Sequence, residues 1–403
     1  MTTDQQKKEN RHPGIRRMTT KTGEVKYRLI IDMGERPDGK RDQRCETFNR
    51  LTDAKARQAE IKNGRKKGTL VKPSKITVAQ AIDGWLAGRR NLRPSTRRSY
   101  RDSLELAKAR IGRIQLQNLT KAHLDHLVTE LQEHGRRVGN VQRQGLSGRS
   151  VNLMLTLLGS VLEDQVKQGT LSRNVAKLVE RPEHRKKDIG TWTERRAAAF
   201  LEAVSTDRLS AAFHLSLFGL RRGEVLGLCW YDLDLDAKTL TIRRARTEVT
   251  GEGVVEGPPK TERGRRTLPL DEGLITALRS LKTQQARERL AAGEVYSSSC
   301  GDCGGEHLVT DEAGHPLRPE RYSDQFRNLA KAAGLPVIRL HDARHTSVTL
   351  MVLRGVPIPV VSKWHGHATA AFTMSVYAHS QDDALVAAGA TLAEAYRTSQ
   401  SGV

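Results

Sequence analysis

The segment RLHDARHT (339–346) places residues of two different chemistries at helical spacing. His341 and His345 are four residues apart, the spacing at which one face of a helix presents two imidazoles to a zinc ion. His341 and Arg344 are three residues apart, which also puts them on one face, as a proton donor and a clamp for phosphate oxygens. Because the segment alone fits both a metal and a phosphate, the other reactive residues must decide.

Two further segments carry side chains suited to a phosphate. In FGLRRGEVLGL (218–228), Arg221 lies at a tight turn before an expected helix, and Glu224 follows three residues later. A planar guanidinium binds two phosphate oxygens at once, and a carboxylate orients it. In PPKTERGRRTLPL (258–270), Lys260 lies near the expected tip of a β-hairpin, a mobile place from which an ammonium reaches into a cleft. The ordinary alternatives are a local Arg–Glu pair and a solvated lysine.

The segment KWHGHATAAFTMSVYAH (363–379) adds a histidine and a tyrosine downstream of these basic residues. His367 precedes Tyr377 by ten residues, and Gly366 allows a tight approach of the backbone. A tyrosine that follows arginine, lysine and histidine in this way is a candidate nucleophile for phosphoryl transfer. A tyrosine taken alone is more often a core residue.

A zinc site is the competing hypothesis for the histidines. The HExxH pattern is absent because position 342 is Asp, one methylene shorter than the Glu that such a site uses as its base. Cys45 and Cys229 stand alone in the sequence. The segment CGDCGGEH offers three ligands of a structural site without an evident fourth: Cys300, Cys303 and His307. We therefore predict no metal ligand, and the cysteine pair stays open between a zinc site and a Gly-rich loop.

The charge of the chain indicates a polyanionic partner. The 68 Lys and Arg outnumber the 46 Asp and Glu, giving a formal net charge of +22 and a pI near 10.1. Each phosphate that a basic side chain contacts releases condensed counterions, so this excess favours nucleic acid. Aromatic residues make up only 4%, which favours duplex DNA over stacked single strands. Neither an apolar run of about 18 residues nor a signal peptide is present, so we expect a cytoplasmic protein.

The N-terminal region is strongly basic. Residues 1–75 contain 21 Lys and Arg against 10 Asp and Glu, an excess of +11 (21 − 10). Alternating apolar residues predict strands at 25–33 and 44–48, and helical spacing follows at 51–68. A small sheet with one helix and this charge suits a DNA-binding module, so we predict a small α+β domain over residues 1–72.

The rest of the chain has a predominantly helical pattern. Residues 76–183 repeat apolar positions at helical spacing, which predicts an all-α bundle. Residues 188–403 combine helices with strand-like segments at 240–250 and 265–270, which predicts a mainly helical α+β domain. Seven basic residues of the first two domains are predicted to contact DNA: Arg28, Lys40, Arg41, Arg93, Arg97, Arg98 and Arg149.

Taken in order, the reactive residues resemble those of the tyrosine site-specific recombinases, and more narrowly of phage-type integrases: Arg221 in GLRRGE, Lys260 in PKT, His341 and Arg344 in HDARHT, His367 in HGH and Tyr377 in YAH. The resemblance covers the whole chain and implies an arm-type DNA-binding domain, a core-binding domain and a catalytic domain. Members of the family often have HDLRHT and LGH where this chain has Ala343 and His365, so we expect small changes of packing there.

The resemblance implies a mechanism. Tyr377 would attack the scissile phosphate and leave a 3′-phosphotyrosyl link and a free 5′-hydroxyl, while Arg221 and Arg344 clamp the non-bridging oxygens. Lys260 would protonate the leaving group, and His341 would assist proton transfer at the nucleophile. His367 would donate a hydrogen bond to a phosphate oxygen, and Glu224 would orient Arg221. The covalent link keeps the phosphodiester energy, so neither ATP nor a metal cofactor is expected.

The resemblance also implies a nucleoid-associated location in a bacterial host, and it implies partners. The enzyme would integrate or excise a mobile element by binding double-stranded attachment sites with core and arm sequences. It would act as a homotetramer on DNA, with an excisionase or directionality factor and a DNA-bending host protein. A DNA-binding regulator and a topoisomerase-like DNA-relaxing enzyme on the same scaffold are the alternatives. The C-terminal tail has apolar residues at helical spacing: Leu385, Ala388, Leu392 and Ala395. In the family such a tail packs on a neighbouring protomer, and the alternative is packing on its own chain.

Overall fold

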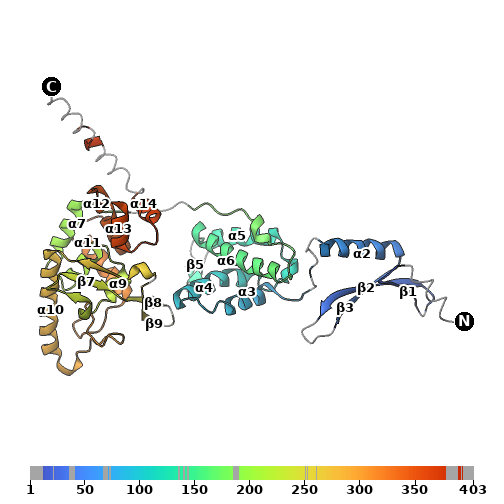
Figure 1. Ribbon diagram of the computed structural model, residues 1–403, viewed down its shortest axis with the longest axis horizontal. Helices are drawn as coiled ribbons and strands as arrows, with labels where there is room; N and C mark the ends of the chain where they lie inside the picture. The colour runs from blue at the N-terminus through green and yellow to red at the C-terminus, as the bar shows by residue number, and fades with distance from the viewer. Residues whose placement is uncertain are drawn as a thin grey trace. The chain divides into compact units, whose positions relative to one another are not determined.

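The computed structural model divides the chain into two compact units, Met1–Arg185 and Lys186–Val403 (Figure 1). It describes residues 12–20, 22–35, 41–66, 71, 74–134, 137–138, 141–142, 145–184, 190–249, 251, 253–259, 261–377, 389–391 and 393. Within these residues, no helix has both the length and the apolar character needed to cross a membrane.

The N-terminal part of the first unit is an antiparallel sheet covered by one helix. The strands are β1 (Ile15–Thr19), β2 (Val25–Glu35) and β3 (Arg41–Phe48), in the order β1-β2-β3, and the helix is α2 (Leu51–Lys66). Alternation along β2 directs Leu29 and Ile31 into a small core with Ala54 and Ile61 of α2. The predicted strands and helix are therefore present, together with β1, which the sequence pattern did not indicate.

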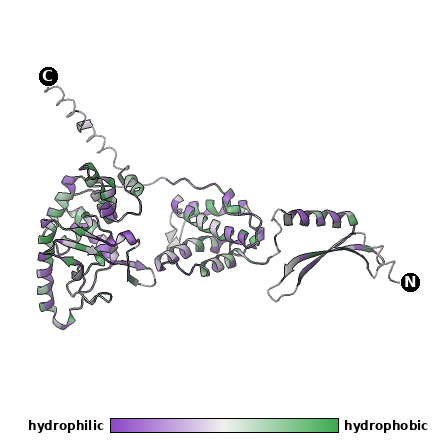
Figure 2. Ribbon diagram, viewed as in Figure 1, coloured by the Kyte–Doolittle hydropathy of each residue, from purple (hydrophilic) through white to green (hydrophobic). Residues whose placement is uncertain are grey.

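The second part of the first unit is a helical bundle. Its elements are α3 (Val78–Ala87), α4 (Pro94–Ile111), η1 (Leu116–Asn118), α5 (Lys121–His134), β4 (Arg137–Val138), β5 (Val141–Gln142), α6 (Gly148–Lys167) and η2 (Val175–Leu178). Figure 2 shows hydrophobic and hydrophilic residues mixed along these helices, as in amphipathic helices around a core. Thr77 and Ser147 cap α3 and α6 with their side chains. One expectation is wrong: the short β4–β5 pair interrupts the all-α pattern.

The two parts of the first unit have separate hydrophobic cores that share no residue. One core belongs to the sheet and α2, and the other to the bundle. This agrees with the idea of two modules in the first unit, but the proposed limits 1–72, 76–183 and 188–403 stay predictions.

The second unit is mainly helical with two small β elements. Its helices are α7 (Glu194–Ala203), α8 (Ser210–Leu217), α9 (Arg222–Leu226), η3 (Trp230–Asp232), η4 (Glu262–Gly264), α10 (Glu272–Ala292), η5 (Gly293–Val295), α11 (Pro319–Ala332), α12 (Leu340–Leu353), α13 (Ile358–His365) and α14 (Ala370–Tyr377). Its strands are β6 (Leu233–Asp234), β7 (Thr239–Ile242), β8 (Ala245–Val249), β9 (Gly253–Gly257) and β10 (Arg266–Pro269). The sheet has the order β10-β7-β6, and β8 pairs with β9 as a hairpin.

The strand predicted over 240–250 is divided in the structure. β7 ends at Ile242 and β8 begins at Ala245 in a different sheet. At the break Arg244 is buried and its Nη1 lies 3.0 Å from Asp232 Oδ2. A buried guanidinium needs such a partner, and a pattern of apolar residues does not record it.

Candidate active site

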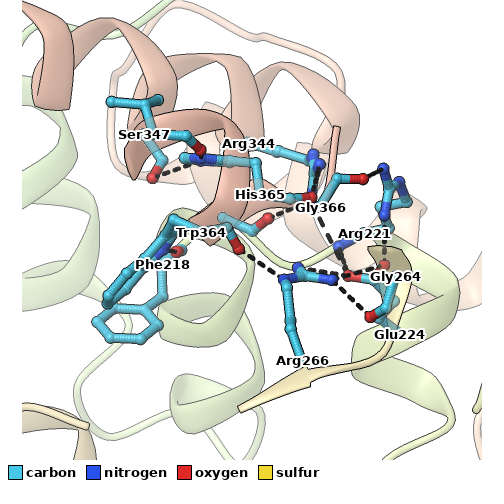
Figure 3. Close-up of polar contacts among 12 residues, drawn as sticks. Phe218, Arg221, Glu224, Gly264, Arg266, Arg344, Ser347, Trp364, His365 and Gly366 are labelled. Atoms are coloured by element: carbon cyan, nitrogen blue, oxygen red, sulfur yellow. Dashed lines mark hydrogen bonds and ion pairs between the residues drawn. The ribbon is translucent and has the colours of Figure 1, made fainter. Parts of the chain in front are cut away.

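Arg221 is placed by the start of α9. The carboxylate of Glu224, in the first turn, accepts a hydrogen bond from the backbone N–H of Arg221 at 2.9 Å. The same carboxylate receives Nη1 of the Arg221 side chain at 2.6 Å, so Glu224 both caps the helix and orients the guanidinium. The second terminal nitrogen of Arg221 donates to the carbonyl of Gly366 at 2.9 Å (Figure 3).

His341 and Arg344 are placed by the start of α12. Asp342 accepts from the backbone N–H of Arg339 at 3.2 Å and from its guanidinium at 2.8 Å, which caps the helix where HDARHT begins. Asp342 is therefore a structural residue. His341 and His345 lie on one face, with ring centroids 4.8 Å apart in an edge-to-face contact. Among the described residues no cluster with metal-ligand geometry includes either of them.

Arg344 is a buried cation held by backbone carbonyls. Only 2% of its side chain is exposed, and its terminal nitrogens donate to the carbonyls of Gly219 and His365. Gly219 has φ +104°, and a Cβ there would lie 2.6 Å from Nε2 of His365. The turn before Arg221 thus needs glycine to bring α8, α12 and α13 together.

Arg266, which the sequence analysis did not single out, completes the cluster. It is the first residue of β10, it is almost fully buried, and its Nη2 lies 3.0 Å from Glu224 Oε2. Its Nε donates to the carbonyl of Trp364 at 2.6 Å (Figure 3). Three guanidiniums, those of Arg221, Arg266 and Arg344, thus lie 2.6, 3.0 and 3.9 Å from one buried carboxylate. The excess of positive charge suits an anion.

The end of α13 carries the two histidines of HGH. His365 is buried, donates from Nδ1 to the Val361 carbonyl at 2.9 Å, and accepts at Nε2 from the Ser347 hydroxyl at 3.1 Å. The departure from the usual family residue is therefore accommodated by hydrogen bonds. Gly366 ends the helix with φ +60°, and a Cβ there would lie 2.6 Å from the carbonyl oxygen of Arg263.

His367 follows directly and is also buried. Its Nδ1 lies 2.8 Å from the Thr373 hydroxyl, in α14. This contact joins the HGH loop to the helix whose last residue is Tyr377. The side chain of Tyr377 lies outside the described part of the structure, and the whole of Lys260 lies outside the described residues.

Burial and positive charge act together on the pKa values of the site. Burial, followed by the charges of Arg344 and Arg221, lowers the pKa of His367 to about 3. Exclusion of water by neighbouring protein, followed by the charge of Arg344, lowers the pKa of His341, although this side chain keeps contact with solvent. Burial, followed by the charge of Arg221, lowers the pKa of Arg344. Burial opposes ionisation of Glu224, but Arg266 and Arg221 outweigh it and lower the pKa of that carboxyl. A bound phosphate would relieve the repulsion among the cations.

The structure thus brings four predicted residues and their support to one place. Arg221, Arg344 and His367 converge around the 365–367 loop, and His341 lies within reach of their charges. The residues that sequence reasoning missed are Arg266 and Thr373. The RGRRTLPL segment offered three arginines without a way to choose among them, and Thr373 carried no signal.

The predicted DNA contacts of the sheet lie on two strands. Arg28 is half-buried in β2, where it pairs in register with Arg16 of β1 and Thr47 of β3. Neighbouring residues Leu29 and Ile31 face α2, so Arg28 and Arg16 belong to the opposite face of the sheet. Arg41 is exposed at the start of β3. Lys40 lies outside the described residues.

The predicted DNA contacts of the bundle lie at two helix starts. Arg93 is exposed at the N-cap of α4, and Arg97 donates to the carbonyl of Arg90 at 3.3 Å. Arg98 is partly neutralised by Asp102, at 3.0 Å. Arg149 is exposed in the first turn of α6.

Comparison with known proteins agrees with this arrangement. Residues 192–384 match the sequence profile of the phage integrase family. A tyrosine recombinase XerC-like protein of Caldanaerobacter subterraneus subsp. tengcongensis is 27% identical over 383 residues, 89% of this chain and 93% of that protein. Residues 192–384 form a phage integrase family domain, that of a tyrosine recombinase. The ICEBs1 integrase of Bacillus subtilis is 27% identical, over 62% of this chain and 66% of its own length.

Two solved structures share the fold of this chain. The Tn1549 transposon integrase, in complex with transposon right-end DNA, gives a TM-score of 0.65 at 21% identity and covers 79% of this chain and 99% of its own. A lambda integrase dimer bound to a COC′ core site gives a TM-score of 0.52 at 15% identity, covering 91% and 95%. At these identities the likeness concerns the fold, and it agrees with a mainly helical multi-domain integrase with small sheets.

Proposed function

We propose that this chain is a site-specific DNA recombinase that cuts and rejoins duplex DNA to integrate or excise a mobile element. The observation that carries the proposal is the convergence of the Arg221 and Arg344 guanidiniums on the loop that holds His367, directly before the helix that ends at Tyr377. The names of the relatives, which include a tyrosine recombinase, integrases and a transposase, favour recombination over a DNA-binding regulator or a topoisomerase.

The chemical step is a transfer of a phosphoryl group between two oxygens. The hydroxyl oxygen of Tyr377 bonds to phosphorus while the bond to the 5′-oxygen breaks, which leaves a 3′-phosphotyrosyl link. The tyrosine proton passes toward His341, and Lys260 supplies a proton to the leaving 5′-oxygen. Arg221 and Arg344 offset the charge that gathers on the non-bridging oxygens. Attack by a 5′-hydroxyl of another strand reverses these steps and restores a phosphodiester.

His367 acts in its neutral form. With a pKa of about 3 it carries no charge near neutral pH, so one ring nitrogen donates and the other accepts. We assign the Thr373 hydroxyl, 2.8 Å from Nδ1, as the donor of this hydrogen bond, which leaves the Nε2 proton for a phosphate oxygen. Thr373 is thus a positioning residue for His367.

DNA binding is assigned to both parts of the first unit. The face of the sheet that carries Arg16 and Arg28 would bind arm sites, and the starts of α4 and α6 would contact phosphates of the core site. We infer a homotetramer on DNA, with an excisionase or directionality factor and a DNA-bending host protein as partners. A solved lambda integrase tetramer bound to a Holliday junction, at a TM-score of 0.53 and 16% identity, supports the tetramer. The tail residues Leu385, Ala388, Leu392 and Ala395 lie outside the described residues.

The proposed function is tested with a nicked suicide substrate, which traps the covalent intermediate because the strand end diffuses away. The Tyr377→Phe variant is expected to bind DNA with unchanged affinity and to form no covalent adduct. Tyr231→Phe is the matched control, because Tyr231 is 71% exposed in the same unit and is expected to form adduct as the wild type does. Adduct formed by Tyr377→Phe would exclude Tyr377 as the nucleophile.

A further inference from the structure

A second cluster of reactive side chains lies beyond the end of α9. Cys229 and His307 face each other in an antiparallel bridge, with the Trp230 N–H donating to the Glu306 carbonyl at 2.9 Å. Directly paired residues of an antiparallel bridge have side chains on the same side. Cys229 Sγ accordingly lies 3.8 Å from Nδ1 of His307, and both residues are buried. The sequence interpretation that Cys229 stands alone is therefore wrong.

The CGDC segment brings two more thiols to the same point. The Sγ atoms of Cys229, Cys300 and Cys303 all lie within 4.8 Å of one another, and all three thiols are free. Cys300 and Cys229 are 1% and 0% exposed, so water does not separate them. Cys229 and Cys300 are buried and Cys303 is partly buried, and thiols make only weak hydrogen bonds with one another. A cation bound at this point would stabilise the thiolates.

The backbone between the two cysteines of CGDC has the form of a metal-binding knuckle. Backbone N–H groups of Cys303 and Asp302 lie near the thiol of Cys300, and that of Gly305 lies near the thiol of Cys303. The turn is closed by the Gly304 N–H, which donates to the Cys300 carbonyl at 2.9 Å, and Gly304 has φ +66°. Backbone donors aimed at sulfur stabilise the thiolate, the form that binds metal.

We propose that a structural Zn²⁺ binds at this point through four ligands: Cys229, Cys300, Cys303 and His307. In a tetrahedral site with Zn–S bonds of about 2.3 Å, neighbouring ligand atoms are roughly 3.8 Å apart. The separation of Cys229 Sγ and His307 Nδ1 has this value, the three sulfurs lie within 4.8 Å of one another, and a ring nitrogen of His307 lies within 4.8 Å of Cys300 Sγ. The two-residue spacing within CGDC is typical of structural zinc sites.

Groups around the ligands complete the arrangement. Glu256 Oε2 lies 3.7 Å from His307 Nε2, so a histidine that binds zinc through Nδ1 would donate its other N–H to this carboxylate. Nη1 of Arg244, which is 4% exposed, lies 3.4 Å from Cys303 Sγ. Three thiolates and a neutral imidazole around Zn²⁺ leave one negative charge, and the guanidinium of Arg244, which also pairs with Asp232 and Asp302, lies beside it. Glu256 also lies within 4.8 Å of Cys300, but it faces the nitrogen of His307 turned away from Cys229, so we assign His307 as the ligand.

The site is structural because its four ligands leave no position for a substrate. Zinc would connect three segments that are distant in sequence: the end of α9, the loop that follows η5 and, through Glu256, the β8–β9 hairpin. The first residue of α9 directly follows Arg221. The metal would thereby hold the turn that presents Arg221 without touching DNA.

Metal analysis of the full-length protein, purified without a metal-affinity tag, tests the site. The wild type is expected to contain one zinc per chain, and Cys303→Ser and His307→Gln to contain far less. Cys45→Ser is the matched control, because this exposed cysteine belongs to β3 and its loss should leave the zinc content unchanged. Glu256→Gln should also retain zinc. Loss of zinc in Glu256→Gln with retention in His307→Gln would overturn the assignment of His307.

A second measurement covers variants that fail to fold. Wild-type protein in which Co²⁺ replaces zinc is expected to show the thiolate-to-cobalt absorption of a tetrahedral sulfur site, and a thiol reagent is expected to release the zinc stoichiometrically. Wild-type protein from zinc-supplemented culture that contains no zinc, or that carries a disulfide between Cys300 and Cys303, would overturn the proposal. Neither readout depends on recombination, so the zinc site and the proposed function stand or fall separately.

Discussion

The hydrogen bond between His367 and Thr373 predicts how the cleavage rate changes when the Thr373 hydroxyl is replaced by a methyl group. Thr373→Val keeps the shape of a fully buried side chain but removes the hydroxyl that lies 2.8 Å from His367 Nδ1. His367 must then either leave Nδ1 without a donor or move its proton to Nδ1, which turns the acceptor Nε2 toward the phosphate. A buried polar group without a partner costs about 1–3 kcal/mol, which corresponds to roughly a 5- to 150-fold change in rate.

The assay is the rate of covalent adduct formation on the suicide substrate at saturating protein. Thr373→Val is expected to slow this rate within that range and to leave DNA affinity unchanged, because the contact acts on the reacting phosphate. Thr373→Ser keeps the hydroxyl and should form adduct within about threefold of the wild type. A valine variant with the wild-type rate, or a serine variant as slow as the valine one, would refute the role of the hydrogen bond.

Three further predictions concern charge and domain roles. Glu224→Gln leaves three guanidiniums without their buried counter-charge and should lower the free energy of unfolding by about 3–5 kcal/mol, measured by urea denaturation. The free energy of unfolding should fall as pH drops below about 6.5, because buried histidines bind protons more readily in the unfolded chain. In the folded protein the pKa of His345 is lowered to about 4 and that of His367 to about 3. Urea midpoints measured between pH 7 and pH 5 check the sign. The lowered pKa of Glu224 acts in the same direction at still lower pH. Deletion of residues 1–72 should abolish binding to arm-site DNA and spare binding to core-site DNA in a mobility-shift assay, and the reverse pattern would contradict the assignment of the arm module.

Several features of this protein were predictable from the sequence because they depend on residues close together in the chain. The helix that begins near His341 needs only the local capping of Arg339 by Asp342, and the strands of the N-terminal sheet follow from alternation. The order of arginine, lysine, histidine and tyrosine segments was enough to indicate the family, since so long an ordered set rarely arises by chance. The same order favoured a phosphate over a catalytic zinc at His341 and His345.

Other features depend on contacts between distant segments, for which the sequence carries no local signal. Arg266 reaches Glu224 across 42 positions, and the two arginines beside it in RGRR look identical in sequence. Cys229 meets Cys300 only because a bridge pairs it with His307, so a lone cysteine became part of a candidate zinc site.

The physical reason for this division is that capping and periodicity are set by neighbouring residues. Buried charges and thiols instead need partners, and only the folded chain decides which distant groups fill that need. The sequence determined the chemistry that this protein performs on a phosphate. The tertiary structure decided which buried groups hold that chemistry in place.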